Sequence, residues 1–491
     1  MENNSSTLQA MNILVVGASG YVGRHLVPKL LQQGHKVRVS ARRVTELVAL
    51  FDQQPVDICP MDLLQPTTVT EACRDIDIAF YLVHSMQAGD DFAERDRRAA
   101  HVFGREASRA GIKQIVYLGA LAPEDTHSLH LRSRAETGEA LREGGVPVTE
   151  LRAPIIVGAG SVPFEAIRDM VNHLPGMLLP TAVKNKSAPI ALDNLLFYLV
   201  GVMACREAYQ QIYDVAGPDT ISYLQQIEKY AAVTEQRFKP LPFFLISIAM
   251  VRFGMPLFSS APKGVIKALL GGLKHDILAD DKAIRTLLPQ PLLSYEQAVE
   301  KALADEQSWP APLTWFQGNM AFREGWRNAA FYGDCLVLSH ESAMPAKPIW
   351  QVLSKIGGKQ RFFFMNWVWA IREWIDFCVG GPGRDLGRDT ANKFVVGERV
   401  DSWNILRVNE EKSVLLGFGM KGPGSGNLEF RLEPLPDGGT RITMLAYWHP
   451  AGFWGQLYWY SMMRPHTFLF WGMLRRISAL AVKQHLRSSP D

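Results

Sequence analysis

The sequence has few of the features that mark secreted, metal-binding or nucleic-acid-binding proteins. Its 491 residues contain only 5 cysteines, which are widely spread and form no C-x-x-C pair. This pattern argues against a disulfide framework and against a zinc site. The formal net charge of +3 is too small to indicate a nucleic-acid partner. We therefore expect no metal, no nucleic acid and a reducing, cytoplasmic location.

Long hydrophobic runs are also missing. The most apolar stretches, 241–258 and 458–474, are interrupted by Pro, Arg or Gly and fall short of the roughly 20 apolar residues that cross a membrane. Residues 1–10 are polar and lack the basic start and apolar stretch of a secretory signal. We predict a flexible tail there. A peripheral contact with the inner face of a membrane stays open as an alternative.

Tryptophan is absent from the first three hundred residues, since all 12 tryptophans lie at or beyond Trp309. A chain of this length is also too long for a single hydrophobic core. Both observations favour two domains, at 11–308 and 331–487, with a linker at 309–330. The linker begins with the closely spaced Pro310 and Pro312, and prolines interrupt both helices and strand pairing.

The first domain shows alternating strand and helix patterns. Residues 12–16 form a short apolar run that leads directly into a glycine-rich segment and then into a helical pattern. Further apolar runs that indicate strands lie at 36–40, 76–84, 114–119 and 148–156. Such alternation predicts the α/β class, with a doubly wound parallel sheet of the Rossmann type.

The glycine-rich segment points to a dinucleotide. Glycines at positions 17, 20 and 23 between a strand and a helix let a pyrophosphate approach backbone N–H groups at the helix N-terminus, where side chains would block it. A glycine turn without a ligand is the structural alternative. The predicted cofactor-binding residues of this segment are Gly17, Ala18, Ser19, Gly20, Tyr21, Val22 and Gly23.

An acidic residue is missing after the second strand, where NAD-selective enzymes commonly place one. Arg42 and Arg43 stand there instead, and guanidinium groups suit a ribose 2′-phosphate. We therefore expect NADP in preference to NAD, with NAD as an alternative cofactor. The two arginines could also be solvated residues at the start of a helix. Asp62 could accept a hydrogen bond from the adenine amino group, or it could cap a turn.

These motifs resemble the atypical short-chain dehydrogenase/reductases of the NmrA-like or extended type, in particular the bacterial YbjT-like proteins that add a C-terminal domain of unknown function. The similarity rests on the residues at 17–23, 81–86, 151–158 and 213–218. It implies that the loops after strands four, five and six enclose the nicotinamide. Leu63, Val83 and His84 complete the predicted cofactor-binding residues.

The catalytic pattern of the broader superfamily is not evident. Its members use a Tyr acid and a Lys at Tyr-x-x-x-Lys, whereas here His130 and Arg134 occupy the two places, and residues 119–121 offer no hydroxyl. Because His130 and Arg134 are four residues apart, they share one face of a helix. Histidine can donate a proton near neutral pH, so the pair is a catalytic candidate. An exposed, non-catalytic pair is the alternative, and His84 is a second candidate.

The second domain has strand patterns at 402–408, 414–420, 428–432 and 441–448, followed by a helical pattern from about 455 to 482. An antiparallel sheet on a long helix resembles the α+β helix-grip fold of START-like and polyketide-cyclase-like domains. Such folds enclose a hydrophobic cavity, although aromatic residues at this spacing are also typical of a simple core. The candidate lining residues are Trp367, Trp369, Trp403, Trp448, Trp459 and Phe470.

Several polar residues of the second domain could orient a ligand head group or cap turns. They include Arg372, Glu373, Asp376, the segment 380–384, Asp401 and His449. The sequence as a whole predicts an NADP(H)-dependent oxidoreductase that acts on a hydrophobic carbonyl-like or quinone-like substrate. A non-catalytic NADP(H) sensor and a carrier of a hydrophobic ligand remain alternatives.

Overall fold

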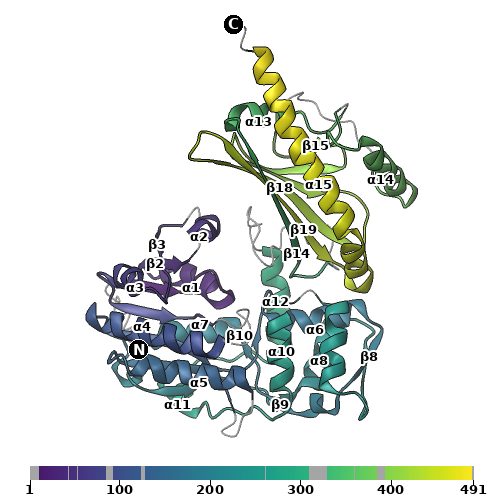
Figure 1. The fold of residues 1–491 in the computed structure, drawn as a ribbon. Coiled ribbons are helices and arrows are strands. Elements are labelled where there is room, and N and C mark those ends of the chain that lie inside the picture. The colour runs from purple at the N-terminus through teal and green to yellow at the C-terminus, as the bar shows by residue number, and fades with distance from the viewer. Residues whose placement is uncertain are drawn as a thin grey trace. The chain divides into compact units, whose positions relative to one another are not determined.

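The computed structural model divides the chain into two compact units (Figure 1). The first comprises 1–256 and 261–310, and the second comprises 257–260 and 311–491. The structure describes residues 10–42, 44–51, 54–84, 92–122, 128–259, 261, 263–308, 329–358, 360–383 and 393–488. Arg43, nearly all of the predicted tail and most of the predicted linker lie outside these ranges.

The first unit contains a seven-stranded sheet of order β11-β6-β5-β4-β1-β2-β3, in which every pairing is parallel. This arrangement confirms the predicted doubly wound Rossmann sheet. Its strands are β1 (Asn12–Val16), β2 (Lys36–Ala41), β3 (Val56–Pro60), β4 (Ile78–Tyr81), β5 (Gln114–Ala120), β6 (Val148–Ala153) and β11 (Ile212–Asp214).

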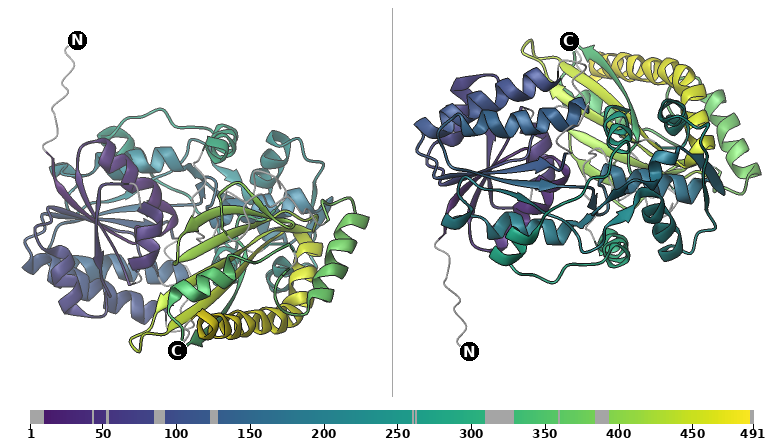
Figure 2. Two further views of the ribbon diagram at one scale, coloured as in Figure 1. Left: turned by 90° about the horizontal axis from the view of Figure 1, so that it is seen from above. Right: turned by 90° about the horizontal axis from the view of Figure 1, so that it is seen from below.

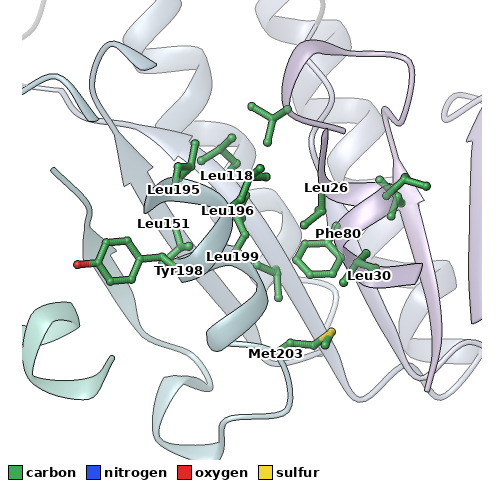
Figure 3. Packing of buried hydrophobic residues seen from close by; sticks show 14 of the residues in the cluster. Leu26, Leu30, Phe80, Leu118, Leu151, Leu195, Leu196, Tyr198, Leu199 and Met203 are labelled. Atoms are coloured by element: carbon green, nitrogen blue, oxygen red, sulfur yellow. The ribbon is translucent and has the colours of Figure 1, made fainter. Parts of the chain in front are cut away.

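Alternate residues of each strand point to opposite sides of the sheet. Both sides carry buried apolar side chains, and helices cover both faces. One face packs α1 (Tyr21–Gln32) and α7 (Leu192–Gly201) in a single buried cluster, where Leu26 and Leu30 lie beside Phe80 (Figure 3). The other face buries a second cluster against α3 (Pro66–Cys73), α4 (Phe92–Arg109) and α5 (Leu129–Arg142). Helix α2 (Val44–Phe51) follows β2.

An extension follows the sheet. The strand pattern at 148–156 proves to be two strands, β6 and β7 (Ile156–Val157), because Pro154 between them has no N–H to donate. The extension's strand pairs are β7 with β10 (Ile190–Ala191), β8 (Gly176–Leu179) with β13 (Lys239–Pro242), and β9 (Lys186–Ser187) with β12 (Ile221–Ser222). Its helices are α6 (Val162–His173), α8 (Tyr223–Val233), α9 (Ile248–Gly254), α10 (Lys263–Gly272), α11 (Lys282–Leu287) and α12 (Tyr295–Ser308).

The second unit contains a six-stranded antiparallel sheet of order β14-β19-β18-β17-β16-β15. The sequence predicted four of these strands and missed β14 and β15. The strands are β14 (Asp334–Ser342), β15 (Arg399–Val400), β16 (Trp403–Asn409), β17 (Ser413–Phe418), β18 (Gly424–Pro434) and β19 (Thr440–Pro450).

One long helix, α15 (Gly452–Ser488), covers one face of the antiparallel sheet, as predicted (Figures 1 and 2). Its Met473, Leu474 and Ile477 are fully buried with Leu428 and Phe430 of β18. Two shorter helices, α13 (Ala346–Leu353) and α14 (Asn366–Cys378), complete the unit and were not predicted. No helix of the described ranges is long and apolar enough to cross a membrane.

Candidate functional site

The carboxyl ends of the central parallel strands meet at one edge of the first sheet. Strand β1 lies between β2 and β4. The strand order therefore extends from β1 toward β3 on one side and toward β11 on the other, which makes this position a topological switch point. Open α/β sheets bind ligands outside the carboxyl ends of the strands at such a switch point. The glycine turn follows β1, and the segment that ends in His84 follows β4.

The glycine turn is closed so tightly that side chains would not fit. Gly17 has a φ of +88°, and a Cβ atom there would lie 2.9 Å from Val83 Cγ2. A Cβ atom on Gly23 would lie 2.4 Å from the carbonyl oxygen of Gly17. That oxygen also accepts a hydrogen bond of 2.9 Å from the Gly20 amide. Glycine is therefore required at positions 17 and 23 by backbone geometry and close approach.

Helix α1 begins at Tyr21, and its N-cap, Gly20, provides no side-chain cap. Ala18 and Val22 are buried in the core, so they hold the turn in place, whereas Gly20 is exposed. A helix N-terminus carries partial positive charge and backbone donors. Because this turn is exposed and its glycines have no side chains, it fits the pyrophosphate of a dinucleotide.

The end of β2 offers groups for a ribose. Arg42 follows the strand and is exposed, while the buried hydroxyl of Ser40 has no hydrogen-bond partner. Arg24 was not among the predicted residues, and its guanidinium lies 5.7 Å from the centre of the Tyr21 ring in the first turn of α1. A positive charge directly after Gly23 was the signal that could have identified it.

Asp62 has a capping role in the structure. Its carboxylate accepts a 3.0 Å hydrogen bond from the Leu64 amide and a 3.4 Å bond from the Gln65 side chain. Leu63 packs against the hydrophobic cluster beneath. Contact of Asp62 and Leu63 with an adenine stays a prediction.

The structure brings together the three predicted residues on the other side of the switch point. The rings of His84 and His130 lie 6.3 Å apart, edge to face. Arg134 is buried, donates from Nη2 to the Leu118 carbonyl oxygen of β5, and has no hydrogen-bond partner for Nη1. The Tyr117 hydroxyl donates a 2.7 Å hydrogen bond to the Arg134 carbonyl oxygen. These contacts fix α5, and with it His130, against β5.

Both histidines are neutral near neutral pH. Burial, followed by the positive charge of Arg134, lowers the pKa of His130 to about 4. Desolvation by surrounding protein atoms, then Arg134 and then His130 lower the pKa of His84 to about 3, although the residue is exposed to solvent. A pKa this low disfavours His130 as a proton donor near neutral pH, and its catalytic role stays a prediction. A neutral imidazole instead polarises an acceptor through an N–H hydrogen bond.

The absence of a hydroxyl side chain at position 119, near the end of β5, has a steric explanation. A Cβ atom on Gly119 would lie 2.8 Å from Glu150 Oε1. Glu150 is fully buried and is held by Arg142 and by Arg152, whose Nε lies 2.9 Å from the carboxylate. A buried carboxylate in an ion-pair network thus occupies the space that a side chain at position 119 would need.

The second unit has a cavity between its sheet and the helices α14 and α15. It is partly open to solvent. Five of the six predicted residues line it: Trp369, Trp403, Trp448, Trp459 and Phe470. The prediction for Trp367 is wrong, since this side chain is 62% exposed and lies outside the cavity. It projects from the opposite side of α14, two positions away from Trp369.

Several polar residues of this unit were predicted either to orient a ligand head group or to cap turns. Most of them have structural roles. Glu373 pairs with Arg361 at 2.9 Å. Asp376 accepts hydrogen bonds from the amides of Gly383 and Lys421, at 2.8 and 2.6 Å. The exception is Arg372, which lines the cavity. Asp401 accepts a 3.0 Å bond from the Gly358 amide, His449 contacts the Ala330 carbonyl oxygen, and Arg384 lies outside the described residues.

Comparison with family models identifies both units. Residues 17–153 match the NAD(P)H-binding family, and residues 326–473 match a family described as a protein of unknown function, DUF2867. The first unit is therefore an NAD(P)H-binding Rossmann domain. The predicted cofactor class is confirmed, as is a C-terminal domain of unknown function.

Two curated relatives match part of the chain. The chain is 25% identical over 150 residues to a ceramide reductase of Caulobacter vibrioides, and 30% identical over 111 residues to the sterol demethylase protein B of Methylococcus capsulatus. These matches cover 30% and 22% of this chain, and 47% and 34% of the two relatives. The chain thus matches less than half the length of either relative.

Solved structures share the fold of the first unit. An NADPH-dependent quinone oxidoreductase from Escherichia coli, solved with NADPH, has a TM-score of 0.50 at 17% identity, and the match covers 59% of this chain and 99% of that one. A Citrobacter triphenylmethane reductase solved with NADP(H) gives the same values. At this level of identity the likeness shows the fold alone.

Proposed function

We propose that the protein is an NADPH-dependent reductase of the atypical short-chain dehydrogenase/reductase type that acts on an apolar carbonyl-like or quinone-like substrate. The observation that supports this proposal is the grouping of His84, His130 and Arg134 at the same sheet edge as the glycine turn. The ceramide and sterol in the names of the two curated relatives are consistent with an apolar substrate.

The residues of the chain would have distinct roles. The turn at 17–23 would hold the pyrophosphate, and Arg42 and Arg43 would bind the 2′-phosphate that distinguishes NADPH. NADPH supplies a hydride when bound. His130, neutral because of burial and Arg134, would donate an N–H hydrogen bond to the substrate oxygen as negative charge develops there. Water would provide the proton that completes the reduction.

The test is NADPH oxidation with quinones and unsaturated carbonyl compounds as acceptors. His130→Ala should lower the turnover rate by about a hundredfold, as expected for loss of a group that stabilises the transition state, and should leave the Kd for NADPH unchanged. His101→Ala, on the exposed surface of α4, is the matched control. Turnover by His130→Ala equal to that of the unaltered protein would exclude the proposed role.

A non-catalytic NADP(H) sensor is the second candidate. The observation that favours it is the ion-paired Glu150 in place of a catalytic hydroxyl beside Gly119. A sensor would bind NADPH with high affinity, oxidise none of the acceptors and change its protease sensitivity on binding. Measuring proteolysis with and without NADPH, alongside the oxidation assay, separates the two candidates.

We further propose a peripheral contact of the second unit with a membrane surface. Three apolar side chains lie along one side of α14: Trp367, Ile371 and Trp374 are 62%, 49% and 67% exposed. Their spacing of four and three residues places them on one helix face, and tryptophan favours the membrane interface.

Co-sedimentation with phosphatidylcholine vesicles tests this contact. Trp374→Ser should reduce the bound fraction several-fold, because one of the larger apolar groups of that face is lost. Val337→Ser, at an equally exposed apolar position on β14, should have no effect. Equal binding by both variants would contradict a contact through α14.

A further inference from the structure

Two tryptophans that line the cavity of the second unit have indole N–H groups without a hydrogen-bond acceptor. Trp403 and Trp459 line it and are only 6% and 3% exposed. In both residues the indole Nε1 is buried without a hydrogen-bond partner. Tryptophan can only donate, and a buried donor without an acceptor is destabilising. A ligand atom that accepts hydrogen bonds would satisfy these groups.

Arg372 adds a positive charge to the same cavity. Its Nη1 contacts the sulfur of Met420, and its Nη2 donates a 3.2 Å hydrogen bond to the Tyr458 hydroxyl. The guanidinium lies 5.1 Å from the centre of the Phe418 ring. A thioether is a weak acceptor and a phenol is uncharged, so neither neutralises the arginine. Arg407 of the same unit differs, since it pairs with the Glu429 carboxylate at 2.8 Å.

The other groups around Arg372 do not supply an anion. His466 lines the cavity, and burial followed by Arg372 lowers its pKa to about 4, so it is neutral. No carboxylate is among the lining residues in the described part of the chain. Among the described residues, the site therefore has one cation and several donors, and no carboxylate lines it. Asn427 adds a side-chain amide whose oxygen and nitrogen both lack partners.

The walls of the cavity are aromatic. The rings of Trp369 and Phe470 are stacked 6.2 Å apart, and His466 stacks on Phe470 at 5.1 Å. Trp448 donates to the Gly455 carbonyl oxygen at 3.0 Å, so its polar atom is satisfied and its ring serves as wall. Such walls favour an acyl chain or a flat ring.

We propose that this cavity binds an apolar carboxylic acid, with an acyl chain or aromatic ring between the tryptophans and the carboxylate facing Arg372. A carboxylate matches the paired donors of a guanidinium and accepts further N–H groups. All residues concerned belong to the second unit, so the site does not rest on the proposed reductase activity. This assigns a ligand class to a domain whose family is described as being of unknown function.

The experiment uses the full chain without NADPH, and dansyl-labelled undecanoate and its methyl ester as probes, which share the chain and differ in charge. Fluorescence titration should show that the acid binds at least about tenfold more tightly than the ester, since a charge-assisted hydrogen bond is lost in the ester. Arg372→Met should reduce affinity for the acid to that for the ester, and Arg372→Lys should restore part of it.

Arg475→Met is the control, because Arg475 is exposed on α15, where its guanidinium lies 4.6 Å from the Trp471 ring centre. Its affinity for the acid should equal that of the unaltered protein. Thermal unfolding confirms that each variant is folded, and Tyr458→Phe provides a second, milder perturbation of Arg372. Equal affinity for acid and ester, unchanged binding by Arg372→Met, or no binding of either probe would overturn the proposal.

Discussion

The two candidate sites are built from different parts of the polypeptide. At the glycine turn, the main chain itself forms the site, within seven consecutive residues that comprise the turn after β1 and the start of α1. In the second unit, residues from α14, four strands and α15 converge on one cavity. The first kind of site can be recognised from local sequence, whereas the second exists only after distant segments have packed together.

The largest expected effect comes from placing an acidic side chain in the glycine turn. Gly20→Asp should weaken NADPH binding by at least about a hundredfold, because a carboxylate would face the pyrophosphate and like charges cost several kcal/mol. Calorimetric titration measures this loss. Binding of dansyl-labelled undecanoate should stay unchanged, and a parallel loss of both ligands would show that the two sites are not independent.

Arg42→Ala tests the side-chain contribution to the first site. Removing one charge-assisted hydrogen bond should weaken NADPH binding by roughly tenfold or more, with little change for NADH, which lacks the 2′-phosphate. Titrations with the two nucleotides give the ratio directly. An equal effect on both would indicate that Arg42 contributes a general electrostatic attraction and does not select NADPH.

Acidification should destabilise both units. Burial lowers the pKa of His130 and of His466 to about 4, from an ordinary value of 6.5. Between these values the unfolded chain binds more protons than the folded chain, so stability present above pH 6.5 is lost as the pH falls toward 4. Scanning calorimetry should show a falling Tm over this range, and a smaller fall in His466→Asn. A Tm independent of pH would contradict these directions.

The smallest effect concerns the ring beside Arg372. Phe418→Leu removes the cation–π contact but keeps an apolar wall, and should weaken binding of the acid by roughly two- to fivefold. The methyl ester should be unaffected. A similar loss for both probes would assign Phe418 to packing and not to the recognition of charge.

Sequence patterns predicted the Rossmann sheet because each of its signals is local. The run at 12–16, the glycine spacing and the alternating strands and helices reflect backbone requirements within a few residues. The strands at 403–409 and 440–450 were found for the same reason. Strand β14 was missed because it pairs with β19, which follows it by about a hundred residues in the chain.

The chemistry of the candidate sites was less predictable. That His130 and Arg134 share a helix face follows from their spacing, but the low pKa of His130 depends on burial by the folded protein. Trp367 and Trp369 look alike in sequence, yet one is exposed and the other lines the cavity. The role of Arg372 depends on which groups surround it, and Tyr458 and Met420 come from other elements.

The packing around Glu150 also limits how this chain can change over time. Cβ atoms on Gly119 and Gly138 would lie 2.8 and 2.6 Å from its carboxylate oxygens. A single mutation that introduced a serine at position 119 would therefore meet an occupied space, and removing Glu150 first would leave Arg142 and Arg152 without their partner. A hydroxyl at this position thus requires coordinated substitutions at several buried residues.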